Sequence, residues 1–238
     1  MVELSVVFGI LGICVALFLF LSPIPTIRRI VRARNSLEYS QLPYLAQVVE
    51  SSFWSLWAIA QGDRLEMLIN NLIGITFMTI YVLIFTCFVS NVKRNSTYLQ
   101  ILVSVVLVTI GIVVLLFVEN STASLFLSIA AVVLNCIKYA SPLSVAKLVI
   151  QTKSVTYMPL PLTIACMLCS ILWGMYGVLL NDIWIIVPNA CGVVCSTMQI
   201  LLWCCYCKRS TGSKTSSTGT MEKEEKIIVV CHSTPLVV

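Results

Sequence analysis

Two tryptophans and two asparagines occupy corresponding places in two similar stretches of this sequence. Trp54 and Trp173 are 119 residues apart, and Asn71 and Asn189 are 118 residues apart. An aromatic face packs on the C–H surface of a sugar, while a carboxamide offers donors and an acceptor to its hydroxyl groups. Such a matched set suits a polyhydroxylated ligand. The alternatives are a tryptophan belt at a membrane surface and asparagine hydrogen bonds between helices.

A longer repeated pattern surrounds these residues. The segment Tyr139–Val155 repeats the order found in Leu21–Leu37: Ser-Pro, apolar residues, basic residues and a polar end. A spacing of 119 residues is far longer than a solenoid repeat and favours a duplicated helical bundle. Proline removes a helix hydrogen bond and kinks the chain, so matched prolines favour hinges in a moving gate. The matched prolines are Pro23, Pro43, Pro142 and Pro159.

Glu50 and Lys138 are ionisable residues inside apolar stretches. An unpaired charge at the centre of a membrane helix costs about 2.5 to 3.5 kcal/mol on insertion scales. Pairing, neutralisation or access to water must reduce this cost. One hypothesis is that the two side chains approach each other across a substrate path and narrow it or bind the substrate. The alternative is that each side chain reaches the membrane surface separately.

The composition places the chain in a membrane. Hydrophobic residues make up 59% and charged residues 11% of 238 residues, with a mean hydropathy of +0.99. One soluble core cannot bury so many apolar side chains. The net charge of +5 is explained by basic residues on the cytosolic side, so we expect no nucleic-acid partner. The spans show no Ser/His/Asp set, phosphate loop or zinc-type Cys/His spacing, which predicts no enzyme activity, metal or cofactor.

Seven apolar segments have the length that a helix needs to cross a bilayer, about 17 to 25 residues. They predict an all-α membrane protein with seven transmembrane helices. The segments are Leu4–Ile27, Pro43–Ala60, Met67–Val89, Tyr98–Val118, Ser124–Ile150, Leu160–Leu180 and Ile183–Tyr206.

The duplication predicts two parallel three-helix bundles joined by an inversion helix. We expect a first repeat at residues 1–92, the linker helix at 93–122, a second repeat at 123–207 and a disordered cytosolic tail at 208–238. Nearly all arginines and lysines fall on one side of the spans, which places the N-terminus outside and the C-terminus in the cytosol. On the outer side, Asn120 begins an Asn-Ser-Thr sequon that glycosylation could use.

Several motifs in register resemble the SWEET family of bidirectional sugar transporters. The resemblance runs from Phe8 to about Tyr206. It is carried by LFLSPIPT (Leu19–Thr26), LPY (Leu42–Tyr44), NNLIG (Asn70–Gly74), YASPLSVAKLVIQTKSV (Tyr139–Val155), YMP (Tyr157–Pro159), LWGMYG (Leu172–Gly177) and PNACG (Pro188–Gly192).

The resemblance implies a fold, an activity and roles for single residues. It implies two three-helix bundles with an inversion helix, often assembled as a trimer, and uncoupled, bidirectional transport of glucose, fructose or sucrose by alternating access. Membrane lipid and a small sugar are then the expected partners. The implied roles are substrate binding for Trp54, Asn71, Trp173 and Asn189; hinges for Pro23, Pro43, Pro142 and Pro159; an outer gate for Trp57, Tyr176 and Asp182; and selectivity for Leu19, Glu50, Lys138 and Cys169.

The chain also departs from the family pattern. Charged Glu50 and Lys138 stand where small or apolar residues are expected, and Trp57 stands where tyrosine is expected. A charged pair can hold a zwitterion, so a PQ-loop-type amino-acid transporter is an alternative, and a seven-span receptor is a second one. The plasma membrane is the expected location, with the vacuolar or Golgi membrane as alternatives.

Overall fold

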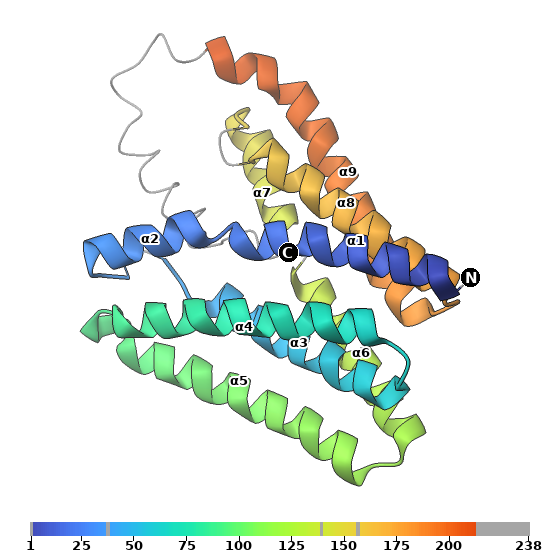
Figure 1. The fold of residues 1–238 in the computed structure, drawn as a ribbon. Coiled ribbons are helices and arrows are strands. Elements are labelled where there is room, and N and C mark those ends of the chain that lie inside the picture. The colour runs from blue at the N-terminus through green and yellow to red at the C-terminus, as the bar shows by residue number, and fades with distance from the viewer. Residues whose placement is uncertain (1, 37–38, 139, 156–157, 213–238) are drawn as a thin grey trace.

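The computed structural model describes residues 2–36, 39–138, 140–155 and 158–212, and the regular elements in these residues are helices (Figure 1). The helices are α1 (Val2–Leu21), α2 (Ile24–Ala33), α3 (Leu42–Gln61), α4 (Leu65–Cys87), α5 (Asn91–Phe117), α6 (Asn120–Lys138), α7 (Ala140–Thr152), α8 (Leu160–Leu179) and α9 (Ile183–Gly212). We call α1–α4 the first half and α6–α9 the second half.

The first of the expected spans is built from two helices. The apolar segment divides into α1 and α2 at Pro23, which caps α2 and lies at the point where the helix is interrupted. This interruption falls in the first copy of the repeated Ser-Pro pattern, where a proline kink was expected. The fifth expected span covers α6 and α7, which lie on either side of residue 139, outside the described residues.

Length and composition identify six helical stretches of the described chain that could cross a membrane. Helix α3 is not among them, although it is 20 residues long and runs beside α4. The reason is its polar content, which includes Gln47, Glu50 and three serines. Most of these polar side chains are buried against the rest of the protein. Helix α3, the remaining membrane-spanning helix, is therefore shielded from lipid by its neighbours instead of being apolar throughout.

The prolines mostly begin helices. Pro43 lies in the first turn of α3, and Pro159 caps α8, where proline loses no helix hydrogen bond. Pro142 belongs to α7 by its backbone, and its side chain lies outside the described residues. The expected interior kink thus occurs at Pro23 and is replaced by a helix start at Pro43 and Pro159. Pro188 is an additional proline inside α9.

Helix α9 continues to Gly212, past residue 208 where the expected tail begins, and the disordered tail stays a prediction. Lysine and arginine are good helix formers and suit the C-terminal end of a helix. The rest of the expected tail, residues 213–238, lies outside the described residues.

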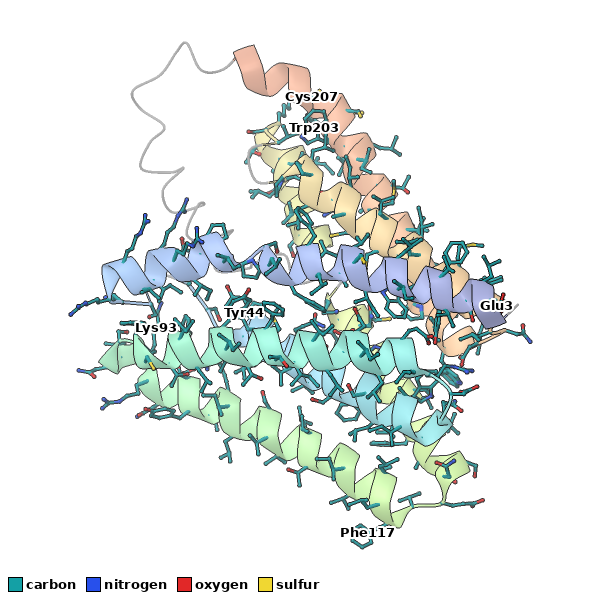
Figure 2. The ribbon with its side chains drawn as sticks, viewed as in Figure 1. Glu3, Tyr44, Lys93, Phe117, Trp203 and Cys207 are labelled. Carbon is teal, nitrogen blue, oxygen red and sulfur yellow. The ribbon has the colours of Figure 1, made fainter. Side chains whose placement is uncertain are left out.

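The two halves are joined by packing of α1 on α8 and of α3 on α6. Helix α5 follows α4 and packs on α3 and α6, while most of its surface is exposed. In Figure 2, Lys93 and Phe117 mark the two ends of α5, and Glu3 lies on the side of the molecule opposite Lys93. Phe117 is 81% exposed. An apolar surface of this kind is suited to lipid.

The halves lie closest to each other near the N-terminus of α1. From there, α8 and α9 diverge from α1–α4 toward the ends that carry α2 and the C-terminus of α9 (Figure 1). We call the end near Glu3 the first end, and the end with α2 and α7 the second end.

Candidate functional site

A cavity of about 160 Å³ lies between the two halves. It is bounded by helices of both halves, and the linker helix α5 contributes none of its lining. Its lining combines polar and apolar side chains. The lining residues are Ala16, Leu19, Phe20, Gln47, Glu50, Trp54, Met67, Asn70, Asn71, Asn135, Lys138, Cys166, Cys169, Ser170, Trp173, Asn189, Gly192, Cys195, Ser196 and Gln199.

The two tryptophans singled out in the sequence both line this cavity, one from each half. Trp54 comes from α3 and Trp173 from α8, and they are 5% and 6% exposed. Each is held by an edge-on aromatic neighbour one turn along its own helix. The ring centroids are 5.5 Å apart for Trp54 and Trp57, and 5.3 Å apart for Trp173 and Tyr176. Their burial inside the protein excludes a belt at the membrane surface.

The two asparagines also line the cavity, and their local geometry is the same. Asn71 Nδ2 donates to the Met67 carbonyl at 2.8 Å, and Asn189 Nδ2 donates to the Ile185 carbonyl at 2.8 Å. Each bond goes back one turn of its own helix and fixes the amide plane. Because a carboxamide has a second N–H and an acceptor oxygen, each asparagine keeps donor and acceptor capacity for a ligand.

The structure joins Glu50 and Lys138. Lys138 Nζ forms an ion pair with Glu50 Oε2 and donates to Gln47 Oε1 at 3.1 Å. The Glu50 side chain is 3% exposed and the Lys138 side chain 13% exposed, so neither extends to a membrane surface. The pairing hypothesis is confirmed, and the alternative of two separate snorkelling side chains is wrong. The pair lies in the cavity wall and links α3 to α6.

Leu19 and Cys169 complete the residues that the sequence suggested for this region. Both are buried and line the cavity, Leu19 from α1 and Cys169 from α8. The eight residues suggested for binding and selectivity are therefore brought together around one space. They come from six helices, and the matched positions lie on α3 and α8 and on α4 and α9.

Six polar lining residues were not recognised in the sequence, two of which are Gln47 and Ser170. Asn70 Oδ1 and Gln199 Nε2 are buried and have no hydrogen-bond partner within the described chain. Asn135 and Ser196 add further polar groups from α6 and α9. The doubled asparagine at residues 70–71 was a signal for Asn70. Gln199 carried no such signal, because it lies ten residues beyond Asn189 in an apolar helix.

At the first end, two polar contacts join the halves. Tyr176 Oη donates to Glu66 Oε2 at 3.2 Å, and Arg64 Nη2 donates to Asp182 Oδ2 at 3.3 Å. Asp182 Oδ1 also accepts from the Trp184 backbone N–H at 3.1 Å, which positions the carboxylate. Tyr176 and Asp182 were suggested in the sequence, whereas Glu66 and Arg64 were not.

Trp57, the third residue suggested for the outer gate, is fully buried and packs on Trp54. Its Nε1 has no hydrogen-bond partner among the described residues, so Trp57 contributes no polar contact to this closure. Arg64 instead supplies the polar partner of Asp182.

The remaining suggested residues lie away from the cavity. Pro23 and Pro159 are at helix starts of the second end, as is Pro43. Asn120 is exposed at the start of α6 and donates to the Ala60 carbonyl at 3.1 Å. An exposed position is a requirement for glycosylation, and use of this sequon stays a prediction.

Comparison with protein families gives a match over most of the chain. Residues 6–93 and 125–211 match the family described as "Sugar efflux transporter for intercellular exchange". The bidirectional sugar transporter SWEET1b of Oryza sativa subsp. indica is 37% identical over 204 residues, covering 84% of this chain and 78% of that protein. SWEET1 of Arabidopsis thaliana is 33% identical over 222 residues, covering 92% of this chain and 88% of that protein.

A solved structure of a eukaryotic SWEET transporter also matches, with 28% sequence identity and a TM-score of 0.81. The match covers 86% of this chain and 97% of that chain. It confirms the all-α membrane fold with seven helices, and with the family match it excludes a seven-span receptor and an enzyme. The chain belongs to the SWEET family of membrane sugar transporters.

Proposed function

We propose that this protein carries monosaccharides across its membrane by facilitated, uncoupled and bidirectional transport. The observation that supports this most directly is the pair Asn71 and Asn189, which present equivalent amides to one cavity between the halves. Trp54 and Trp173 supply apolar faces beside them. Amides for hydroxyl groups and indole faces for C–H surface together fit a sugar ring.

The size of the cavity supports a single ring as the substrate. A cavity of 150 Å³ in another protein holds one benzene molecule, and this one has about 160 Å³. In the conformation observed here, a glucose or fructose unit therefore fits better than sucrose. The binding roles of the lining residues, including Leu19 and Cys169, belong to this proposal.

Alternating access supplies the transport step. The polar contacts Arg64–Asp182 and Tyr176–Glu66 close the first end, while the halves diverge toward the second end (Figure 1). We assign the first end to the outside and the second end to the cytosol, because α2 carries several arginines and basic residues collect on the cytosolic side. The helix starts at Pro23, Pro43 and Pro159 then act as hinges when the cytosolic end closes.

The proposal also covers the membrane in which the protein lies and its oligomeric state. The plasma membrane is our proposed location. A trimer is the proposed assembly, by analogy with the family, and the exposed apolar surface of α5 is compatible with contact to another copy or to lipid.

Uptake of labelled sugars tests the proposal. Cells that express the protein should take up glucose or fructose, and a protonophore should not change the rate. Asn71→Ala and Asn189→Ala should each lower uptake by at least about tenfold, since each removes hydrogen bonds to substrate in a water-poor site. Surface expression must be matched between variants.

The same helices offer matched controls. Thr76 on α4 and Thr197 on α9 are exposed, and each donates back one turn along its helix, at 2.8 Å in both cases. Thr76→Ala and Thr197→Ala should leave uptake unchanged. Equal losses in the asparagine and threonine variants would reject the proposed site, and uptake of a neutral amino acid without sugar uptake would reject the substrate class.

A further inference from the structure

The ion pair between Glu50 and Lys138 has unused hydrogen-bonding capacity on the cavity side. Lys138 has three N–H donors, one of which goes to Gln47 while the ammonium group also pairs with Glu50. Glu50 Oε2 forms this ion pair and is a buried atom without a hydrogen-bond partner in the described chain. Lys138 therefore keeps at least one N–H donor, and the Glu50 carboxylate keeps acceptor capacity. Both residues line the cavity, so a bound ligand can reach these groups.

The pair is held in place from the protein side. Gln47 accepts from Lys138 and donates through Nε2 to Ser51 Oγ at 3.0 Å, so its amide is fixed at both ends. Glu50 and Gln47 are one turn apart on α3. A donor and an acceptor with fixed positions in a poorly solvated wall can discriminate between ligands better than mobile surface groups can.

We propose that Glu50 and Lys138 form a subsite that binds two adjacent hydroxyl groups of a neutral monosaccharide. Lys138 donates to the oxygen of one hydroxyl group, and the neighbouring hydroxyl group donates to Glu50. This inference rests on the proposed sugar transport and adds to it the part of the substrate that this wall recognises. The asparagine amides and indole faces then contact the rest of the ring.

The charges of the pair favour a neutral ligand. Glu50 and Lys138 neutralise each other, so a sugar acid or an amino sugar would compete for one partner and leave the other uncompensated. Leaving a buried charge without its partner is strongly unfavourable. A hydroxyl group is both donor and acceptor and can add to the pair without breaking it. The subsite should therefore exclude charged sugars.

Competition by modified sugars tests the subsite. Glucose analogues that each lack one hydroxyl group are used to inhibit uptake of labelled glucose by the unmodified protein. Hydrogen bonds to charged groups are worth enough to change affinity roughly tenfold to a hundredfold. We expect a loss of this size for two adjacent positions of the ring. Replacing the hydroxyl group by fluorine, which accepts but does not donate, should spare the position that faces Lys138 and not the one that faces Glu50.

Variants assign these positions to the pair. In Lys138→Met, removal of the hydroxyl group that faces Lys138 should cause no further loss, and Glu50→Gln should reduce the loss at the adjacent position. Ile137→Met is the matched control, because Ile137 is 64% exposed beside Lys138, and it should keep the pattern of the unmodified protein.

Two different failures can be told apart. If the unmodified protein takes up no sugar, the proposed function is wrong. If it takes up glucose but the deoxy analogues show no pair of adjacent sensitive positions, or the same pattern persists in Lys138→Met and Glu50→Gln, the pair is only structural and the subsite is overturned. Should the variants not reach the surface, the deoxy and fluoro series on the unmodified protein decides the question alone.

Discussion

The contact between Arg64 and Asp182 should control how often the outer end of the cavity opens. Both side chains are largely buried, 11% and 8% exposed, and their nitrogen and oxygen atoms are 3.3 Å apart. A hydrogen bond between charged groups contributes about 1.5 to 3 kcal/mol. In Arg64→Gln, Asp182 keeps its bond from the Trp184 N–H, so we take the lower limit. That loss should raise the population open to the outside about tenfold.

The cavity contains its own reporters for this measurement. Cys166 and Cys195 line the cavity and are partly buried free thiols. A membrane-impermeant thiol reagent added outside intact cells should modify them about ten times faster in Arg64→Gln than in the unmodified protein. The extent of modification is read by mass spectrometry of the purified protein.

A second arginine contact provides the control. Arg64 Nη1 also pairs with Asp63 Oδ2 at 2.5 Å, but Asp63 is 69% exposed and belongs to the same half. Exposed ion pairs contribute little, so Asp63→Asn should change the labelling rate less than about fivefold. Unchanged labelling in Arg64→Gln, or an equal increase in Asp63→Asn, would refute the assignment of the outer closure to the contact between the halves.

Two further substitutions test how the halves and the helix break are held. In Gly12→Val, the added Cβ atom would lie 2.9 Å from Trp173 Nε1, so the indole must shift. Sugar uptake should therefore fall roughly tenfold to a hundredfold. In Gly174→Ala, the added Cβ atom lies 3.7 Å from Asn189, and sugar uptake should stay near normal. Tyr81→Phe removes a buried 2.9 Å hydrogen bond to the Phe20 carbonyl, next to the helix break between α1 and α2. The purified protein should lose about 1 kcal/mol of stability and melt about 2 to 4 °C lower. Tyr98 is exposed, so an equal shift of the melting temperature in Tyr98→Phe would contradict this explanation.

Much of the site was visible in the sequence because the duplication marks it. A tryptophan or an asparagine alone in an apolar helix has several structural explanations. Occurrence at the same place in two repeats indicates a position on a shared axis, which is where the cavity lies. The same reasoning found the helix break at Pro23, since proline acts locally on its own helix.

Other features were not accessible from the sequence. Gln199 Nε2 faces the cavity, and Arg64 meets Asp182 across 118 residues. Such contacts depend on how each helix is rotated about its own axis and on which helices of the two halves meet. Neither the rotation of a helix nor the choice of its neighbours can be read from consecutive residues. In helix α3, the polar residues make the segment look less like a membrane span than it is. The tertiary structure explains why they are tolerated, because other helices bury them.

The sequence by itself determined the membrane class, the order of the helices and the residues matched by duplication. These properties depend on the length and apolarity of single segments and on repetition along the chain, both of which are written in consecutive residues. The tertiary structure decided that Glu50 pairs with Lys138, that Arg64 meets Asp182 at the first end, and that one cavity collects residues from both halves. Those outcomes depend on distances between segments far apart in the chain, which only the packed bundle sets.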